Sequence, residues 1–172
     1  GASWSQSSSG LAIGGLYGIA GLAQDPSDPL HLYAGTIVTG FDGGIFESTD
    51  GGSSWTNIAG SVITTDGDLG NDSWPIRIDP LDTQTMYCGT PHQSLMVSRD
   101  TGQTWTEANP SGTGANTSCY AVALNPSNSG ELWFDHSSGI YHSTDYASTW
   151  TDVSATFNST RLTDMKFAPS NT

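Results

Sequence analysis

The sequence has few basic side chains: its 172 residues include 4 Lys and Arg against 17 Asp and Glu, which gives a formal net charge of −13. Proteins that bind nucleic acid need a cationic face, and anionic membrane surfaces attract clusters of Lys and Arg. The sequence also lacks an apolar run near the roughly 20 residues that a membrane helix requires. We therefore predict neither a nucleic-acid nor a membrane partner.

Charged residues of both signs are scarce, at 12% of the chain, whereas glycine occurs 21 times. Six Trp, six Tyr and five Phe are enough for a sizeable core, which argues against disorder. Together these features are typical of an all-β protein with many turns. Only two cysteines occur, Cys88 and Cys119, and the sequence allows either a disulfide or two free thiols.

No basic and apolar leader is visible in the opening residues GASWSQ. Asn71, Asn116 and Asn158 each begin an Asn-X-Ser/Thr glycosylation acceptor. Together with the one-sided acidity and the near absence of Lys, these acceptors favour a mature, secreted and glycosylated chain.

A turn motif recurs three times in full: STDGGSSW at 48–55, SRDTGQTW at 98–105 and STDYASTW at 143–150. The shared pattern is S-x-D-x-G-x-S/T-W, with Ala147 in place of glycine in the third copy. We expect the aspartate to accept backbone N–H bonds, the glycine to adopt positive φ, and the tryptophan to pack on a neighbouring sheet. Ala147 suggests a third turn that is looser or avoids positive φ. The structural residues of this motif are Asp50, Trp55, Asp100, Trp105, Asp145 and Trp150.

Short apolar runs keep the same spacing, and the first run of each repeat ends at an X-Pro turn. Four short antiparallel strands in every 40–50 residues or so describe a β-propeller blade, and propellers need about four to eight blades to close. We therefore predict an all-β, incomplete propeller, completed by missing sequence or by other chains. The predicted parts are 1–18 (last strand of a preceding blade and a loop), three blades at 19–60, 73–110 and 119–155, and 161–172 (first strand of a following blade).

Successive strands of a blade run in opposite directions. The loops that join the second strand to the third therefore lie on the same face as the loops that join successive blades. Because these loops are long and variable, we expect the functional residues there. The predicted substrate-binding residues are Tyr17, Trp74, His92, Asp135 and His136. Trp133 is a further aromatic candidate, although it also suits a blade core. The acidic loop 66–72 lacks the spacing of a calcium-binding EF-hand, and the histidines lack zinc-site spacing, so we predict no metal and no cofactor.

The turn motif resembles the Asp-box, or bacterial neuraminidase repeat, of the sialidase-like propeller superfamily. Within it, 19–36, 44–55 and especially 129–153 resemble secreted xyloglucanases, glycoside hydrolases with two propellers facing a cleft. That resemblance implies a polysaccharide substrate and hydrolysis by two aspartates, one from each propeller, acting as acid and base. Asp42, in Phe41-Asp42-Gly43-Gly44, best matches the first of these catalytic aspartates. No second aspartate can be matched, so we expect this chain alone to be inactive.

Two other functions remain open at this point. A true sialidase holds its substrate carboxylate with an arginine cluster, and only Arg77, Arg99 and Arg161 are present. Arg99 lies within a repeat turn on the face opposite the long loops, so this chain cannot supply such a cluster by itself. The stronger alternative is a non-catalytic secreted propeller that serves in carbohydrate binding, adhesion or protein assembly.

Overall fold

The computed structural model describes residues 8–11, 16–38, 44–58, 75–90, 93–113, 117–156, 162 and 165–167. These residues form three four-stranded antiparallel sheets, each a simple meander in chain order. The first sheet comprises β1 (Leu16–Gln24), β2 (Leu32–Val38), β3 (Ile45–Ser48) and β4 (Thr56–Asn57). The second comprises β5 (Ile76–Ile78), β6 (Met86–Gly89), β7 (Leu95–Ser98) and β8 (Thr106–Glu107). The third comprises β9 (Val122–Leu124), β10 (Leu132–His136), β11 (Gly139–Ser143) and β12 (Thr151–Asp152).

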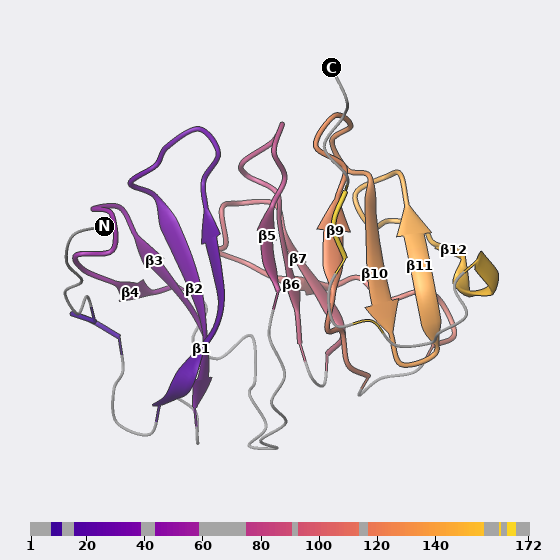
Figure 1. Cartoon of the computed structure of the whole chain (residues 1–172), viewed down its shortest axis with the longest axis horizontal. Helices are drawn as coiled ribbons and strands as arrows, with labels where there is room; N and C mark the ends of the chain where they lie inside the picture. The colour runs from indigo at the N-terminus through magenta and orange to yellow at the C-terminus, as the bar shows by residue number, and fades with distance from the viewer. Residues whose placement is uncertain are drawn as a thin grey trace.

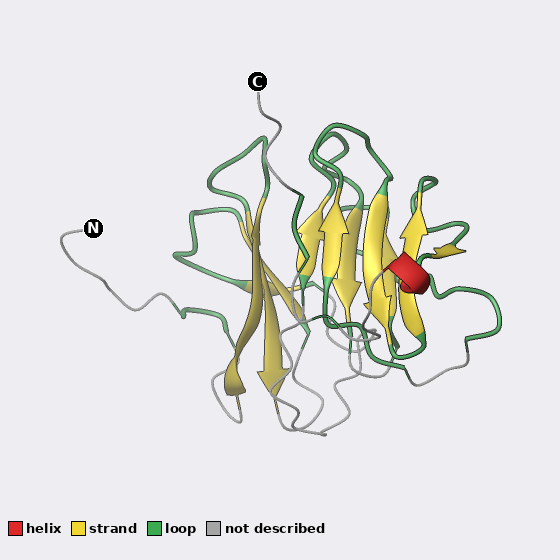
Figure 2. Ribbon diagram, turned by 45° about the vertical axis from the view of Figure 1, so that its right-hand side comes forward, coloured by secondary structure: helices red, strands yellow, loops and turns green. Residues whose placement is uncertain are grey.

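The sheets stand face to face, and their first strands β1, β5 and β9 follow one another along one side (Figure 1). Figure 2 shows the same stacking from a second direction, with the single 3-10 turn η1 (Ser154–Thr156) after the last strand. This is the predicted arrangement of propeller blades around an incomplete circle. In the described part of the chain, η1 is the only helical segment, and no helix there is long and apolar enough to cross a membrane.

The core lies between blades, because neighbouring sheets bury their facing sides against each other. Between the first and second blades, Tyr33 and Ile45 pack with Ile76, Met86 and Trp105. A second cluster fills the space between the second and third blades. It consists of Tyr87, Leu95, Val97, Cys119, Val122, Leu132, Phe134, Tyr141 and Ala147. The middle blade therefore has neighbours on both sides, which explains why every residue of β6 and β7 is buried.

The far face of the first blade has no blade beside it among the described residues. Ala34, Phe46 and Trp55 form a small cluster there, against which Leu11 packs from the start of the chain. Leu22 on the same sheet remains 65% exposed. Such an exposed apolar side chain on a sheet face is what an unclosed propeller leaves behind.

The three repeat turns share one hydrogen-bond pattern. In each, the serine hydroxyl donates to the aspartate at 2.8 Å, and the aspartate accepts the N–H four residues after it, also at 2.8 Å. Each turn also bonds to the preceding strand connection of its own blade, for example through Gly51 N–H to the Leu30 carbonyl at 2.9 Å. The expectation for Ala147 was wrong. It has φ of 65° and donates to Ser143 at 3.0 Å, as glycine does in the other turns.

Two predicted blade limits differ from the structure. β1 begins at Leu16, so the limit between 18 and 19 falls inside a strand. At the other end, the described residues of 161–172 are not assigned to a strand. Met165–Phe167 nevertheless lies beside β9, where the first strand of a further blade would lie (Figure 1).

Candidate functional site

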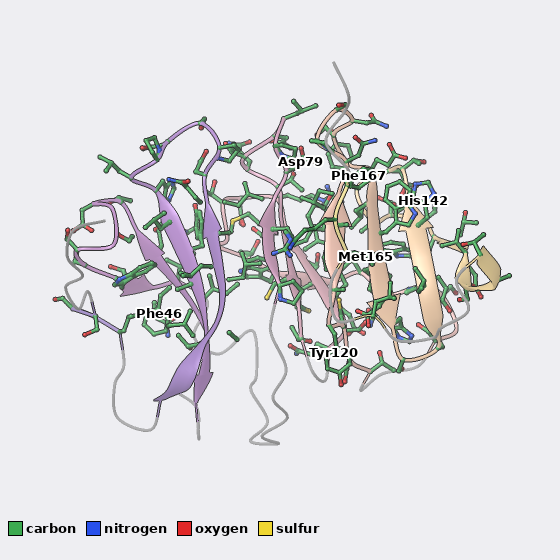
Figure 3. All side chains as sticks on the ribbon, viewed as in Figure 1. Phe46, Asp79, Tyr120, His142, Met165 and Phe167 are labelled. Carbon is green, nitrogen blue, oxygen red and sulfur yellow. The ribbon has the colours of Figure 1, made fainter. Side chains whose placement is uncertain are left out.

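The face of the propeller where β2, β6 and β10 end is the candidate functional face. In the view of Figure 3 this face is the lower edge of the molecule, where Tyr120 lies. Asp79 lies near the opposite, upper edge, which carries the repeat turns. Asp135 and His136 were expected in the loop between the second and third strands of the last blade. They belong instead to β10, because strand pairing continues to His136 opposite Gly139 and leaves only Ser137 and Ser138 in the turn. Both residues are buried.

Asp135 anchors the backbone of this face. Its Oδ1 accepts the N–H groups of Tyr120 and Ala121 at 2.7 and 2.6 Å. Its Oδ2 accepts the N–H of Leu162 at 3.4 Å. One buried carboxylate thus connects the entry to the third blade with the segment that leaves it.

His136 caps the two-residue turn that follows it. The Ser138 N–H donates to Nδ1 at 3.0 Å, and the Ser138 hydroxyl lies 2.7 Å from the same nitrogen. Because an amide N–H can only donate, Nδ1 is the acceptor and the neutral ring carries its proton on Nε2. Nε2 is buried without a hydrogen-bond partner among the described residues, and burial lowers the pKa of His136. The ring is therefore neutral and fixed in one tautomer.

The equivalent positions of the other blades have the same role with a different residue. The Thr36 hydroxyl accepts the N–H of Gly44 at 3.2 Å, and the Thr90 hydroxyl accepts the N–H of Gln93 at 2.8 Å. Each side chain closes the connection to the following strand. His136 is thus a structural cap in its blade. The exposed Ser138 hydroxyl, 2.9 Å from the Tyr141 hydroxyl, is the accessible end of this network.

Two histidine–carboxylate pairs were not anticipated from the sequence. His31 Nε2 lies 2.6 Å from Glu47 in the first blade, and His142 Nε2 lies 3.1 Å from Glu131 in the third. The pairs occupy equivalent places with the two residue types exchanged, since Glu47 is opposite Tyr33 and His142 is opposite Trp133. In both blades, one member of the pair stands directly before the second strand and the other directly before the repeat-turn serine. This matching placement was the sequence signal that could have revealed the pairs.

The third-blade pair carries an aromatic stack. The His142 ring stacks on Trp133 with centroids 3.9 Å apart, and Phe167 meets Trp133 edge-on at 5.0 Å. Hydrogen bonds from Asn128 first, then Asn125 and His142, lower the pKa of Glu131. Trp133 is half-buried under this arrangement. Its two aromatic contacts fit the blade-core alternative for this residue.

The remaining predicted residues are only partly covered by the structure. Tyr17 falls within β1 rather than in a loop before it. Asp42, Trp74 and His92 lie outside the described residues, as do the acceptors Asn71, Asn116 and Asn158. Within the described ranges, no group of three or more His, Cys, Asp or Glu side chains is placed to hold a metal ion.

Cys88 and Cys119 are buried free thiols. They belong to different core clusters: Cys88 packs between the first and second blades, and Cys119 between the second and third. Burial raises the pKa of Cys88 to about 12 and raises that of Cys119 as well. Because the thiolate is the reactive form, both cysteines are chemically inert in this fold.

Comparisons with known proteins agree with this architecture. The "Probable oligoxyloglucan-reducing end-specific xyloglucanase" of Neosartorya fischeri is 26% identical over 145 residues, which cover 80% of this chain and 18% of that protein. The oligoxyloglucan-reducing end-specific xyloglucanase of Emericella nidulans is 29% identical over 149 residues, with the same two shares covered. The chain therefore spans less than a fifth of these relatives. No family model matches it.

Solved structures give the same result for the fold. The Niastella koreensis GH74 enzyme superposes with a TM-score of 0.62 at 25% identity, over 79% of this chain and 22% of that one. The Xanthomonas campestris GH74 xyloglucanase superposes with a TM-score of 0.63 at 18% identity, over 84% and 24%. The chain thus has a xyloglucanase-type fold, of which its described residues form three blades.

Proposed function

We propose that this chain is part of a polysaccharide-active glycoside hydrolase of xyloglucanase type, with Asp42 as one of two catalytic carboxylates. The observation that carries the proposal is the sequence match to two xyloglucanases over 80% of the chain, together with the fold match to GH74 enzymes. Three blades without a second matched aspartate form half of an active site at most. The partner carboxylate comes from sequence outside this chain.

The reaction requires one carboxylic acid that protonates the leaving oxygen and one carboxylate that activates water. In an inverting enzyme the two groups are about 6.5–9.5 Å apart. In the sequence, Asp42 belongs to the connection between β2 and β3. The Thr36 hydroxyl in β2 donates to the carbonyl of Gly44, where this connection ends. A catalytic carboxylate must be positioned by rigid neighbours, and the bond from Thr36 to the Gly44 carbonyl supplies a fixed end to this connection.

Glycan contacts belong to the same face. We assign the sugar-facing roles to Tyr17, Trp74 and His92, because aromatic and imidazole rings suit the apolar faces of sugars. Asp135 and His136, which were also expected to bind substrate, support that face from below instead. Their burial and their bonds to Tyr120, Ala121 and Ser138 are the reason for this revision.

The test is hydrolysis of xyloglucan by the intact protein, measured as new reducing ends. We expect release from xyloglucan, and a loss of about 10²-fold or more in kcat for Asp42→Asn, as removal of a general acid or base produces. Asp28→Asn, an identical change in an exposed turn on the opposite face, is the matched control and should stay within about twofold.

The possible results test the enzyme class and the assignment of the catalytic residue separately. A folded intact protein that releases no reducing ends from xyloglucan or other β-glucans would exclude the hydrolase and favour the non-catalytic propeller. Hydrolysis that survives Asp42→Asn would reject this residue while leaving the class intact. We further propose that the protein is secreted and glycosylated, which enzymatic removal of N-glycans should reveal as a shift in electrophoretic mobility.

A further inference from the structure

The two-residue turn between β10 and β11 presents an exposed serine hydroxyl on the candidate functional face. Pairing of His136 with Gly139 leaves Ser137 and Ser138 in this turn, which lies at the lower edge of the molecule in Figure 1. Both serines are exposed, whereas the side chain behind them, His136, belongs to a residue that is 1% exposed. The turn therefore offers polar groups to solvent from a buried support.

The Ser138 hydroxyl is held on two sides. Its oxygen lies 2.7 Å from Nδ1 of His136 and 2.9 Å from the hydroxyl oxygen of Tyr141. Because Nδ1 accepts the Ser138 amide N–H, it carries no proton in the neutral ring, so the serine O–H also donates to it. A serine hydroxyl has one hydrogen, so the contact with Tyr141 is a donation from the tyrosine to the serine. A chain of hydrogen bonds therefore runs from Tyr141 through Ser138 to His136.

This chain of bonds fixes what the Ser138 oxygen can do toward a ligand. A hydroxyl oxygen has two acceptor positions, and Tyr141 occupies one of them. The hydrogen of the serine is already directed at His136, so the remaining position accepts a hydrogen bond and does not donate one. Successive hydrogen bonds polarise one another, which strengthens each of them. The group that complements this position is a hydrogen-bond donor, such as the hydroxyl group of a sugar.

The third blade differs from the other two at this place. Thr36 and Thr90 cap the equivalent connections with their own hydroxyls, and both residues are buried, at 1% and 2% exposure. The longer side chain of His136 instead supports a hydroxyl that belongs to an exposed residue. Its ring meets the rings of Phe134 and Tyr141 edge-on, with centroids 6.0 and 5.8 Å apart. A contact that packing already holds in place loses little freedom when a ligand binds.

The charge of the protein restricts the ligand further. A net charge of −13 repels anions, and an acceptor position offers no hydrogen to a carboxylate or sulfate group. A neutral sugar, whose hydroxyl groups donate, meets both conditions.

We propose that Ser138 is a contact residue for a hydroxyl group of a neutral glycan, and that Tyr141 is the positioning residue that directs the free acceptor position of the serine outward. This inference rests on the proposed function, because it adds a residue to the same glycan-binding face and specifies a neutral rather than an acidic glycan.

Steady-state hydrolysis of xyloglucan by the intact protein measures the contact. Ser138 lies two blades from the connection that includes Asp42, so its bond to the glycan is equal in the ground state and the transition state. Ser138→Ala should therefore raise KM by about fivefold, the effect of one lost hydrogen bond, and leave kcat unchanged. Ser137→Ala, the same change at the other exposed serine of the turn, is the matched control and should leave both constants unchanged.

Two further variants distinguish a glycan contact from a structural role of the turn. Ser138→Thr keeps the hydroxyl and should retain the KM of the unmodified protein. Tyr141→Phe removes the donor to Ser138 and should raise KM by about threefold, but it should add nothing in a Ser138→Ala background because the tyrosine acts through the serine. Additive effects of the two changes would reject Tyr141 as the positioning residue.

Isothermal titration calorimetry of the intact protein separates this contact from the hydrolase. The probes are neutral xyloglucan oligosaccharides and acidic oligogalacturonates. We expect tighter binding of the neutral probe, and a loss of about fivefold in its affinity for Ser138→Ala alone. Such binding without hydrolysis would reject the hydrolase and support the contact. Hydrolysis with a KM that Ser138→Ala and Ser137→Ala change equally would overturn the contact and leave the hydrolase. Binding of neither probe, or tighter binding of the acidic one, would also overturn the contact.

Discussion

At the scale of single residues, Gly102 and Ala147 occupy the same position in successive repeat turns, and both have positive φ, at 83° and 65°. Their surroundings differ. A Cβ atom added to Gly102 would lie 2.8 Å from Ile58 Cδ1. The residue equivalent to Ile58 in the next blade is Ala108, which packs on the same cluster as Ala147. The neighbouring blade therefore decides which turn accepts a side chain.

This pairing predicts the cost of Gly102→Ala. A left-handed L-residue costs about 1–2 kcal/mol and overpacking about 1–3 kcal/mol, so we expect the free energy of unfolding to fall by about 3 kcal/mol. Gly112→Ala is the matched control, because Gly112 has φ of 85° and an added Cβ would meet nothing within 4 Å. In an Ile58→Ala background, the penalty of Gly102→Ala should shrink to about that of the control. Chemical denaturation of the four variants measures this, and an unchanged penalty in that background would disprove the pairing.

The repeat-turn aspartates predict the response to acid. Hydrogen bonds from Ser54 and Thr149, respectively, lower the pKa of Asp50 and of Asp145 to about 2. A carboxyl group with a depressed pKa binds protons more weakly in the folded protein than in the unfolded chain, where its pKa is about 3.9. The stability it contributes is thus fully present above about pH 4 and is lost as the pH falls toward 2. Urea midpoints between pH 2 and 6 should show this loss, with a shallower slope for Asp145→Asn. An identical slope in that variant would contradict the assignment.

At the scale of elements, Asp79 joins two blades across the face of the repeat turns. Buried at the end of β5, it accepts the Gly130 N–H at 2.8 Å and the Ser129 hydroxyl at 2.9 Å from the next blade. Tyr146 closes the junction, since its hydroxyl donates to Ser129 and its carbonyl accepts from Arg99. Among the described residues, the nearby Asp82 side chain bonds only within its own blade, to Gln84 and Thr85.

Removing this junction should lower the free energy of unfolding more than removing a hydrogen bond within a single turn. Asp79→Ala leaves a buried N–H without an acceptor, so we expect a loss of about 3 kcal/mol in the free energy of unfolding, against about 1 kcal/mol for Asp82→Ala. Thermal or chemical unfolding of both variants measures the difference. Equal losses would show that Asp79 acts only within its own turn.

The contrast between what the sequence predicted and what it missed also belongs at this scale. The blades followed from the regular spacing of Asp50, Asp100 and Asp145, because each turn is built from residues close together in the chain. Asp135 and His136 were wrongly predicted to lie in a loop, because the length of their turn is set by strand pairing. No feature of the nearby sequence reveals that pairing. The Glu131–His142 pair depends on a contact between strands, and the bond from Gly130 to Asp79 is a contact between blades. Such contacts are fixed by register and packing rather than by neighbouring residues.

At the scale of the whole molecule, the described chain is a sector of a propeller rather than a closed domain. The middle blade has a core cluster on each face, whereas the first blade exposes Leu22 and packs only Leu11 on its far side. On the far side of the third blade, Phe167 contacts Trp133. The proposed active site, shared with sequence outside this chain, depends on this sector arrangement.

Native-state hydrogen exchange on the 172-residue chain tests the sector arrangement most directly, because amide protection reports the local free energy of opening. We predict the slowest exchange in β6 and β7, whose residues are buried throughout. Exchange should be faster in the matching strands of the flanking blades, β2 and β3 on one side and β10 and β11 on the other. Equal protection in all three blades, or slower exchange in a flanking blade than in the middle one, would contradict the account.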